Sequence, residues 1–340
     1  KQKTAYEIMP SLVGSEMCIR DRKAAVVGTG SWGKHHLRVL NDLGYLDSFV
    51  EMNDERRKLY EKKYSIKGFS NIDDLVKDHY VDIVNICTPT ITHFEIAKTT
   101  LSNGISTLVE KPLTYSSSQG EELVNLAHDN SAALTVGFVE RFNPVIIDIK
   151  NNLQKQTYGD PLLIEFQREN RWAGVTKDIG VILDSSVHDI DGARWLFNEE
   201  PNVVFARTGN VLNPKASGFV GTDYEDFATI VLGFKNGKTA IIIANWVTPY
   251  KVRRISVTCT DGNLSGDYMS QEIRLDDGNS VTIPTRKHEE PLVNELTSFI
   301  NAVKSNTSPV VTGIDGLNTI KIAEAAITSA KRGSPIYLDL

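Results

Sequence analysis

The sequence predicts an α/β protein in which a doubly wound parallel sheet is followed by an α+β domain with a large, mostly antiparallel open sheet. Two observations support this prediction. From residue 23 to residue 142, short apolar runs alternate with helix-compatible stretches, which is the pattern of βαβ units. After Asn143-Pro144 the pattern changes to closely spaced strand candidates separated by hairpin-type turns. We therefore expect two domains, at residues 23–142 and 143–340.

The first domain is expected to contain strands that are covered by helices on both faces. Its strand candidates are near-continuous apolar runs, as buried parallel strands require. They lie at residues 24–28, 47–52, 82–87, 106–110 and 133–138. Helix-compatible segments lie between them at about 33–43, 91–104 and 117–130, with a charged helix that runs to Lys63. Residues 1–22 show neither periodicity nor capping residues, and we interpret them as a non-native or disordered leader.

The second domain is expected to combine a few helices with many strands. Helices are predicted at about 144–155 and 185–197, and a helical end spans 291–332 with a loop at 308–315. Strand candidates lie at 162–170, 203–210, 226–234, 239–247, 253–260, 262–268 and 271–277. Residues 235–238 and 261–263 supply hairpin-type turns. A sheet with an apolar face needs a helix layer or a partner subunit to cover it.

Composition and charge argue against several classes of protein. The chain is 41% apolar and 24% charged, which is enough material for a sizeable core. Its net charge is -6 and its basic residues are scattered, so we expect no nucleic-acid or membrane partner. Cys18, Cys87 and Cys259 lie far apart, which argues against a zinc site or a disulfide framework. No apolar run approaches the ~20 residues of a membrane helix, and a reducing cytoplasm is the predicted location.

The first strand candidate is followed by a glycine-rich turn, Gly28-Thr29-Gly30-Ser31-Trp32-Gly33. Gly28 permits a tight turn, Gly30 lets the backbone approach a pyrophosphate, and Gly33 allows close packing of helix on strand. The helix that begins here directs its N-terminus at the same anion. The turn, with Ser31 and Trp32, therefore predicts a dinucleotide site in a Rossmann-type domain, and the alternative is a glycine turn without a ligand.

An acidic residue follows the second strand candidate. Glu51 lies where a carboxylate accepts hydrogen bonds from the ribose hydroxyls of a dinucleotide. A carboxylate at this place repels a 2′-phosphate, which favours NAD over NADP. Asn53 and Arg56 keep NADP open as an alternative, because an arginine can pair with a phosphate.

Two later strand candidates end in residues that carry chemistry. Thr88 and Pro89 follow the run 82–87, with His93 close behind, and can wall the cofactor; the alternative is a simple strand-to-helix turn. Glu110 and Lys111 end the run 106–110 at the same edge of the sheet. A lysine near a nicotinamide ring can donate a hydrogen bond to a substrate oxygen and stabilise its developing charge. The alternative is that Lys111 is a solvated surface lysine without a catalytic role.

A second cluster of candidate residues lies in the segment KDIGVILDSSVHDIDGARWLF. Asp184 and His188 are four residues apart, so on an α-helix the carboxylate faces the imidazole and can orient it. Histidine is suited to take the proton of a hydroxyl group. The alternative is that Asp184 and His188 form a pair that only stabilises the structure. Two residues do not complete a metal site and no third ligand is suitably spaced, so a metal-free reaction is predicted.

Taken together, these motifs resemble the Gfo/Idh/MocA oxidoreductases, in order and from Lys23 onward. The stretches that carry the resemblance are GTGSWGKHH, CTPTITH, LVEKPL, VGFVERFNP and GVILDSSVHDID. The resemblance implies NAD(H) or NADP(H) as cofactor and a homodimer or homotetramer built through the open sheet. It also implies that Lys111 binds the substrate oxygen, that His188 is the general acid/base, and that Asp184 is its partner.

Within that family, VERFNP, Thr176-Lys177-Asp178 and NWVTPYKVRRISVTCTDG look most similar to nucleotide-sugar dehydrogenases, especially UDP-N-acetylglucosamine 3-dehydrogenases. Arg168, Arg171 and Lys177 can then meet a substrate diphosphate, because arginine forks suit such oxygens. The alternative is that these side chains lie on a solvated strand edge and loop and bind no ligand. Two other functions stay open: an inositol or free-sugar dehydrogenase with the same catalytic residues, and a non-catalytic sensor that binds a dinucleotide.

Overall fold

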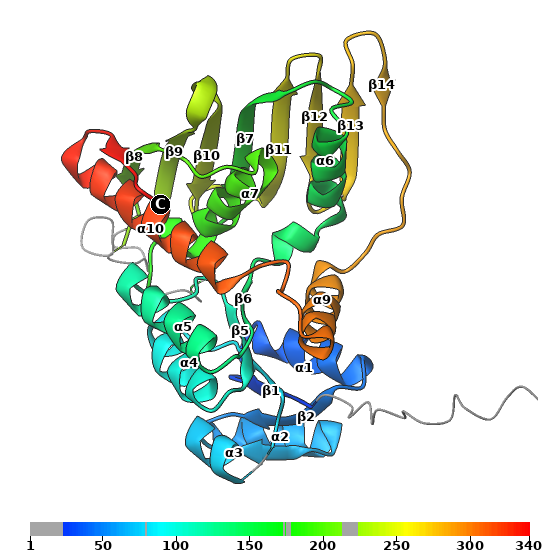
Figure 1. Cartoon of the computed structure of the whole chain (residues 1–340), viewed down its shortest axis with the longest axis vertical. Helices are drawn as coiled ribbons and strands as arrows, with labels where there is room; N and C mark the ends of the chain where they lie inside the picture. Colours follow the sequence, from blue (N-terminus) through cyan, green and yellow to red (C-terminus); the bar gives the residue numbers. More distant parts are fainter. Residues whose placement is uncertain (1–22, 79, 173, 175–177, 213–223) are drawn as a thin grey trace, which may run out of the picture.

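The computed structural model describes residues 23–78, 80–172, 174, 178–212 and 224–340. These residues form two sheets with helices packed against them (Figure 1). The first sheet has six parallel strands in the order β3-β2-β1-β4-β5-β6. The second has nine strands in the order β14-β13-β12-β11-β7-β10-β9-β8-β15, and only its β7–β10 pair is parallel. The predicted fold class is confirmed.

The parallel sheet places the ends of its two central strands side by side. Its strands are β1 (Ala24–Val27), β2 (Leu46–Val50), β3 (Lys67–Phe69), β4 (Ile83–Ile86), β5 (Ser106–Glu110) and β6 (Leu134–Gly137). Its helices are α1 (Gly33–Asp42), α2 (Asp54–Tyr64), α3 (Ile72–Asp78), α4 (His93–Ser102) and α5 (Ser117–Asp129). Every residue of β1 and β4 is buried because helices cover both faces. The strand order reverses between β1 and β4, and this is where open α/β sheets bind ligands.

One helix of the parallel-sheet layer comes from the far end of the chain. Helix α9 (Pro291–Ser305) lies beside α1 (Figure 1). Its buried residues Leu296 and Phe299 belong to the same hydrophobic cluster as Leu37 and Leu40 of α1. Burial of several large side chains of this kind contributes ~1.5–3 kcal/mol for each. Helix α9 is therefore part of the core of the N-terminal sheet.

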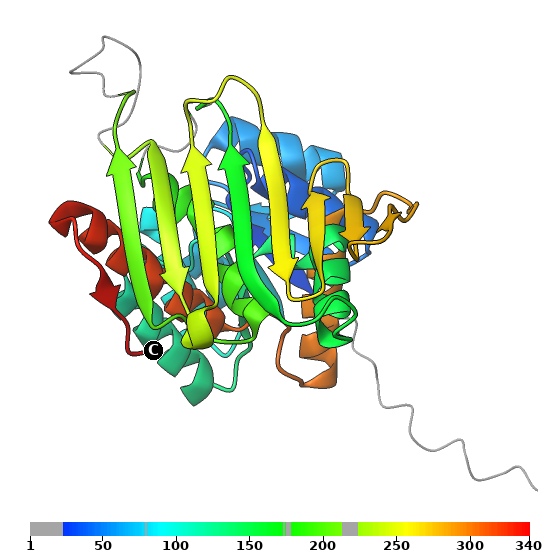
Figure 2. The same ribbon diagram turned by 90° about the horizontal axis from the view of Figure 1, so that it is seen from above.

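The nine-stranded sheet has one face covered by helices and one face without them. Its strands are β7 (Pro161–Glu169), β8 (Val203–Gly209), β9 (Phe227–Gly233), β10 (Thr239–Asn245), β11 (Val252–Cys259), β12 (Gly262–Asp267), β13 (Glu272–Asp276), β14 (Val281–Thr282) and β15 (Ile336–Tyr337). Strand β10 buries Ala240, Ile242 and Ala244 and leaves Ile241 and Ile243 half-buried on the other side. Figure 2 shows that other side, where no helix of the described residues lies.

Three helices cover the inner face of this sheet (Figure 1). They are α6 (Pro144–Gln154), α7 (Val187–Phe197), which continues a π-helical segment at Ile182–Ser186, and α10 (Gly313–Arg332). Buried Arg141, in the short helix after β6, donates to both carboxylate oxygens of Asp191 on α7 at 2.7 and 2.6 Å and to Asp315 on α10 at 3.0 Å. This ion-pair cluster fixes α7 and α10 against the end of the parallel sheet.

Candidate active site

A cavity of about 560 Å³ lies between the carboxyl edge of the parallel sheet and the inner face of the nine-stranded sheet. Its N-terminal wall is formed by Gly30, Ser31, Trp32, Cys87, Thr88, Pro89, Thr90, Glu110, Lys111, Val139 and Glu140. Its C-terminal wall is formed by Arg168, Asp178, Ile179, Asp184, His188, Lys251 and Arg253. The cavity thus brings together residues from most of the predicted motifs.

The three glycines of the loop after β1 are required for different reasons. Gly28 has φ +86°, and a Cβ there would lie 2.7 Å from the side chain of Thr88. A Cβ on Gly33 would lie 1.9 Å from the carbonyl oxygen of Gly28, so the fold itself demands glycine. At Gly30 nothing lies within 4 Å of the Cβ position, and Ser31 and Trp32 beside it are exposed. The open space at Gly30 fits a pyrophosphate that approaches the backbone.

Glu51 lies buried beside this loop, at the end of β2. Its Oε2 accepts hydrogen bonds from the amide and the hydroxyl of Thr29 at 3.2 and 2.5 Å, and its Oε1 accepts one from the Asn53 amide at 2.9 Å. Arg56 Nη1 lies 3.3 Å from Oε2. Burial acts to raise the pKa of Glu51, but these hydrogen bonds and Arg56 lower it overall. A charged carboxylate therefore stands where the ribose of a dinucleotide would lie.

Glu110 links the start of α1 to the end of β5. Its Oε1 accepts hydrogen bonds from the indole of Trp32 and from Nε2 of His36, the latter at 3.0 Å. Asn85 Nδ2 donates to Nδ1 of His36 at 3.2 Å, which leaves Nε2 to carry the proton. The other oxygen of Glu110 accepts the Lys111 amide at 3.2 Å. Glu110 therefore fixes the backbone from which the Lys111 side chain extends.

The loop after β4 supplies Thr88 and Pro89 to the N-terminal wall, but His93 is not part of the wall. His93 is 1% exposed, and its ring nitrogens lie 2.8 and 2.9 Å from the carbonyl oxygens of Pro112 and Thr88. It joins the loop after β4 to the loop after β5 from behind. The ring of His93 therefore positions two loops behind the wall, and its contact with the cofactor stays a prediction.

Lys111 crosses from one wall of the cavity to the other. Its Nζ donates to the backbone oxygen of Asp184 at 2.6 Å and to Oδ1 of the same residue at 2.9 Å. Asp184 lies in the π-helical segment, and Ser185 Oγ donates to its Oδ2 at 3.1 Å. Lys111 and Asp184 are both partly exposed to the cavity. An ammonium group is thus held at the cavity by a residue of the opposite wall.

His188 lies one turn further along and has no bond to Asp184. The predicted four-residue pairing assumed an α-helix, whereas residues 182–186 form a π-helix, whose wider turn moves the two side chains out of line. Nδ1 of His188 is buried and has no hydrogen-bond partner among the described residues. Burial and the charges of Arg168, Lys111 and Arg253 lower the pKa of His188 well below its usual value. The imidazole is therefore neutral at pH 7.

Comparison with known proteins identifies the family. Residues 22–138 match the oxidoreductase family GFO/IDH/MocA with an NAD-binding Rossmann fold, and residues 146–265 match the C-terminal domain of that family. The chain belongs to the Gfo/Idh/MocA oxidoreductases. Its first domain is therefore an NAD-binding Rossmann domain of this family.

Individual relatives cover nearly the whole chain. UDP-N-acetylglucosamine 3-dehydrogenase from Acidithiobacillus ferrooxidans is 25% identical over 88% of this chain and 95% of its own length. Its solved structure superimposes with a TM-score of 0.82 and covers 91% of this chain and 98% of that one. Inositol 2-dehydrogenase from Rhizobium meliloti is 30% identical over 89% of this chain and 95% of its own length.

The three cations predicted to meet a diphosphate have different positions in this Gfo/Idh/MocA protein. Arg168 is 4% exposed and binds Asp189 through two nitrogens and Glu140 at 2.9 Å, so its guanidinium is already paired within the protein. Arg171 is exposed and lies outside the cavity wall. Lys177 lies outside the described residues. The prediction of Arg168 and Arg171 as free diphosphate ligands is therefore not supported by their positions.

Two other cations, Lys251 and Arg253, line the cavity and were not singled out from the sequence. The signal for Arg253 is strand alternation: it shares the parity of buried Ile255 and Val257 on β11, so it faces inward. In the sequence, the segment NWVTPYKVRRISVTCTDG contributes only to the resemblance. Sequence reasoning therefore missed its two cations that line the cavity.

Among the described residues, no three His, Cys, Asp or Glu side chains form a group that could hold a metal ion. No helix in the described part of the chain is long and apolar enough to cross a membrane.

Proposed function

We propose that this protein is an NAD-dependent dehydrogenase that oxidises a hydroxyl group of a nucleotide sugar, with the C3 hydroxyl of UDP-N-acetylglucosamine as the first candidate. The observation that carries the proposal is that Lys111, on the same wall as the glycine loop, and His188, on the opposite wall, line one cavity. An alcohol dehydrogenase needs a donor to the substrate oxygen, a base for the hydroxyl proton and a dinucleotide cradle. The cavity contains all three.

The cofactor proposed for this cradle is NAD. The amides of the loop that runs from Gly28 to Gly33 would hold its pyrophosphate, and Glu51 would accept its ribose hydroxyls. When bound, NAD supplies the nicotinamide ring that accepts the hydride. The lowered pKa keeps Glu51 charged at neutral pH, which disfavours the 2′-phosphate of NADP.

The catalytic roles follow from the chemistry of the two side chains. Lys111 donates a hydrogen bond to the substrate oxygen and stabilises negative charge that develops on it, while Asp184 holds the ammonium group in place. Neutral His188 accepts the hydroxyl proton. The C–H bond breaks with its electron pair, the C–O bond becomes a carbonyl, and the products are a ketone, a reduced cofactor and a protonated imidazole.

Two relatives favour different substrates. The dehydrogenase from Acidithiobacillus ferrooxidans acts on a nucleotide sugar, and the one from Rhizobium meliloti acts on inositol. The second candidate function is therefore an inositol or free-sugar dehydrogenase. The test is to follow absorbance of the reduced nicotinamide with UDP-N-acetylglucosamine, myo-inositol and glucose in parallel, each with NAD and with NADP. Turnover of inositol alone would contradict the nucleotide-sugar proposal.

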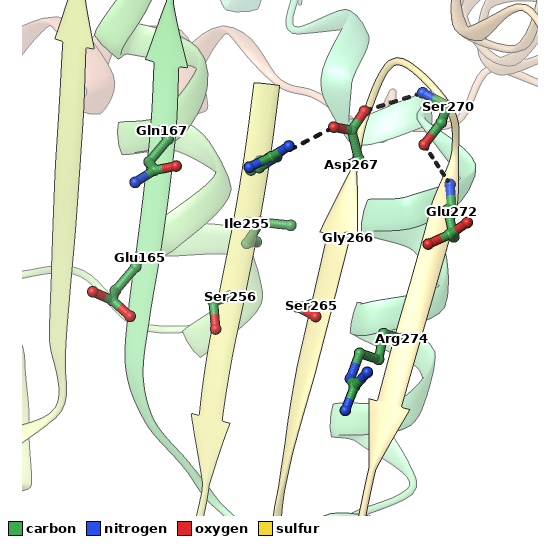
Figure 3. A pocket seen from close by; sticks show the side chains of 11 residues that line it. Glu165, Gln167, Ile255, Ser256, Ser265, Gly266, Asp267, Ser270, Glu272 and Arg274 are labelled. Carbon is green, nitrogen blue, oxygen red and sulfur yellow. Dashed lines mark hydrogen bonds and ion pairs between the residues drawn. The ribbon is translucent and has the colours of Figure 1, made fainter. Parts of the chain in front are cut away.

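The uncovered sheet face supports a homo-oligomer. Half-buried Ile241, Ile243 and Val231 lie on this face without a helix over them. A hollow of about 530 Å³ on this sheet is lined by β7, β11, β12 and β13, with Glu165 of β7 and Ser265 of β12 among its polar side chains (Figure 3). We expect a homodimer or homotetramer that forms through this face in the cytoplasm. Light scattering on the purified protein measures the state, and a monomer at micromolar concentration would contradict it.

A further inference from the structure

The C-terminal wall contains two cations that the catalytic chemistry does not use. Of the residues that the structure describes, four cations line the cavity, namely Lys111, Arg168, Lys251 and Arg253. Lys111 pairs with Asp184, and Arg168 pairs with Asp189 and Glu140. Among the described residues, neither Lys251 nor Arg253 forms an ion pair with a carboxylate.

Arg253 is held in place by neutral acceptors. Its Nη1 donates to the carbonyl oxygens of Glu169 and Val252 at 3.1 and 2.9 Å, and its Nη2 donates to Oδ1 of Asn170 at 3.0 Å. These bonds orient the guanidinium but leave its charge uncompensated. Arg253 also lies directly opposite Arg168 in the antiparallel β7–β11 pair. Like charges opposite each other on one face of a sheet are destabilising.

Lys251 precedes the same strand and lines the same cavity. Burial, and then the charge of Arg253, lower the pKa of Lys251, and burial and Arg168 lower the pKa of Arg253 to about 10. The carboxylates of Asp184, Asp189 and Glu140 act in the opposite direction on Arg253 or Lys251, but each already binds Lys111 or Arg168. Arg253 therefore carries an electrostatic cost that an anion in the cavity would offset, and the exposed ammonium group of Lys251 lines the same cavity.

From this arrangement we infer that Lys251 and Arg253 form an anion subsite, which binds the diphosphate of the nucleotide-sugar substrate while Lys111 and His188 meet the sugar. This inference rests on the proposed function and assigns the residues that select a charged substrate. A guanidinium fork and an ammonium group suit the adjacent oxygens of a diphosphate. An uncharged inositol or glucose offers these cations no counter-charge, so the subsite would separate the two substrate classes found among the relatives.

The cleanest variant is Lys251→Gln, because Lys251 has no bond within the described residues that the change would break. Its control is Lys98→Gln, which removes a cation from the surface of α4, where Lys98 pairs with Glu122 at 2.8 Å. Arg253→Lys provides a second variant that keeps the charge but loses the fork, and thermal melting reports whether each protein is folded.

Calorimetry with UDP and with uridine, on the enzyme saturated with NAD, measures the subsite directly. We expect Lys251→Gln to weaken UDP binding about 10-fold, since a charged hydrogen bond contributes ~1.5–3 kcal/mol, and to leave uridine binding within about 2-fold. The ratio of kcat/KM for UDP-N-acetylglucosamine to that for N-acetylglucosamine should fall by a similar factor. Lys98→Gln should change neither quantity.

The outcomes separate the inference from the proposed function. If the unchanged enzyme oxidises UDP-N-acetylglucosamine but both folded variants, Lys251→Gln and Arg253→Lys, bind UDP as it does, the subsite is wrong and the function stands. If the unchanged enzyme oxidises only inositol and binds no UDP, the proposed substrate is wrong and the subsite is overturned with it. A matching loss of UDP affinity and of the kcat/KM ratio supports both.

Discussion

The two walls of the cavity differ in how their polar side chains are paired. On the N-terminal wall and behind it, Glu51, Glu110 and His93 all have partners within the protein. On the C-terminal wall, Nδ1 of His188 has no partner, and Lys251 has none among the described residues. The first wall is thus preorganised without a ligand, whereas the second keeps polar groups available.

This difference corresponds to what the two walls would bind. A cofactor shared by a whole family allows its site to be rigid and internally satisfied, which limits the free energy lost on binding. A substrate that differs among relatives has to be selected by groups that are unsatisfied without it. In this chain, the cofactor side is therefore expected to respond to mutation through affinity for NAD, and the substrate side through turnover and substrate choice.

Lys111 joins the two walls, so its loss should have the largest effect. Lys111→Met removes the proposed donor to the substrate oxygen, and we expect kcat to fall about 10³-fold while affinity for NAD changes less than about 2-fold. Lys98→Met is the matched control, because Lys98 lies on the surface of α4 in an exposed pair with Glu122. Steady-state kinetics and NAD titration measure the two quantities. Undiminished turnover would favour a dinucleotide sensor over an enzyme.

His188 tests the chemistry of the C-terminal wall alone. We expect His188→Asn to lower kcat about 10²-fold or more, with the exposed His128→Asn as control. Since the folded pKa of His188 lies well below 6.5, the neutral base is present at pH 6.5 and above and is lost as pH falls further. The oxidation rate of the unchanged enzyme should therefore decline only on the acid side of 6.5. If the oxidation rate of His188→Asn declined with pH in the same way, the titrating group would be a residue other than His188.

Two glycines of the N-terminal wall allow a test of whether each is required by protein packing or by ligand binding. Gly33→Ala places a methyl group against the Gly28 carbonyl and should destabilise the protein by about 3 kcal/mol. Gly30→Ala meets no protein atom, so stability should stay within about 0.5 kcal/mol while NAD affinity falls. Urea unfolding and NAD titration compare the pair. Equal destabilisation of both variants would refute a ligand-specific role for Gly30.

The smallest expected effect is at Glu51. Glu51→Ala should weaken NAD about 10-fold and NADP less, because the lost carboxylate bound ribose hydroxyls and repelled a 2′-phosphate. The exposed Glu55→Ala on the same segment is the control. The ratio of KM for the two cofactors is the measurement, and an unchanged ratio would place cofactor selection elsewhere.

Much of the fold follows from patterns that act within short stretches of sequence. Apolar runs predicted most strands of both sheets because burial on one or two faces leaves a clear periodicity. Strands β14 and β15 have two residues each and β3 has three, which is too short for any periodicity. Lys111 and Glu51 were placed at one edge because parallel strands end together there.

The rest of the site depends on contacts between distant segments. Arg168 looked available because its partner Asp189 lies on a helix that reaches it only in the folded protein. Asp184 was assigned to His188 because sequence spacing does not distinguish a π-turn from an α-turn. The bond from Lys111 to Asp184 joins two domains, and no sequence pattern around either residue indicates it.

Helix α9 has a consequence for how such enzymes can be recombined. The nucleotide-binding half of this protein is not a contiguous stretch of gene, because Leu296 and Phe299 complete its core from beyond the second sheet. A chimera that exchanged only residues 23–142 with a relative would pair a foreign α1 with the resident α9. A chimera that exchanges cofactor preference between relatives therefore has to include both residues 23–142 and helix α9. Otherwise the packing between α1 and α9 has to be redesigned.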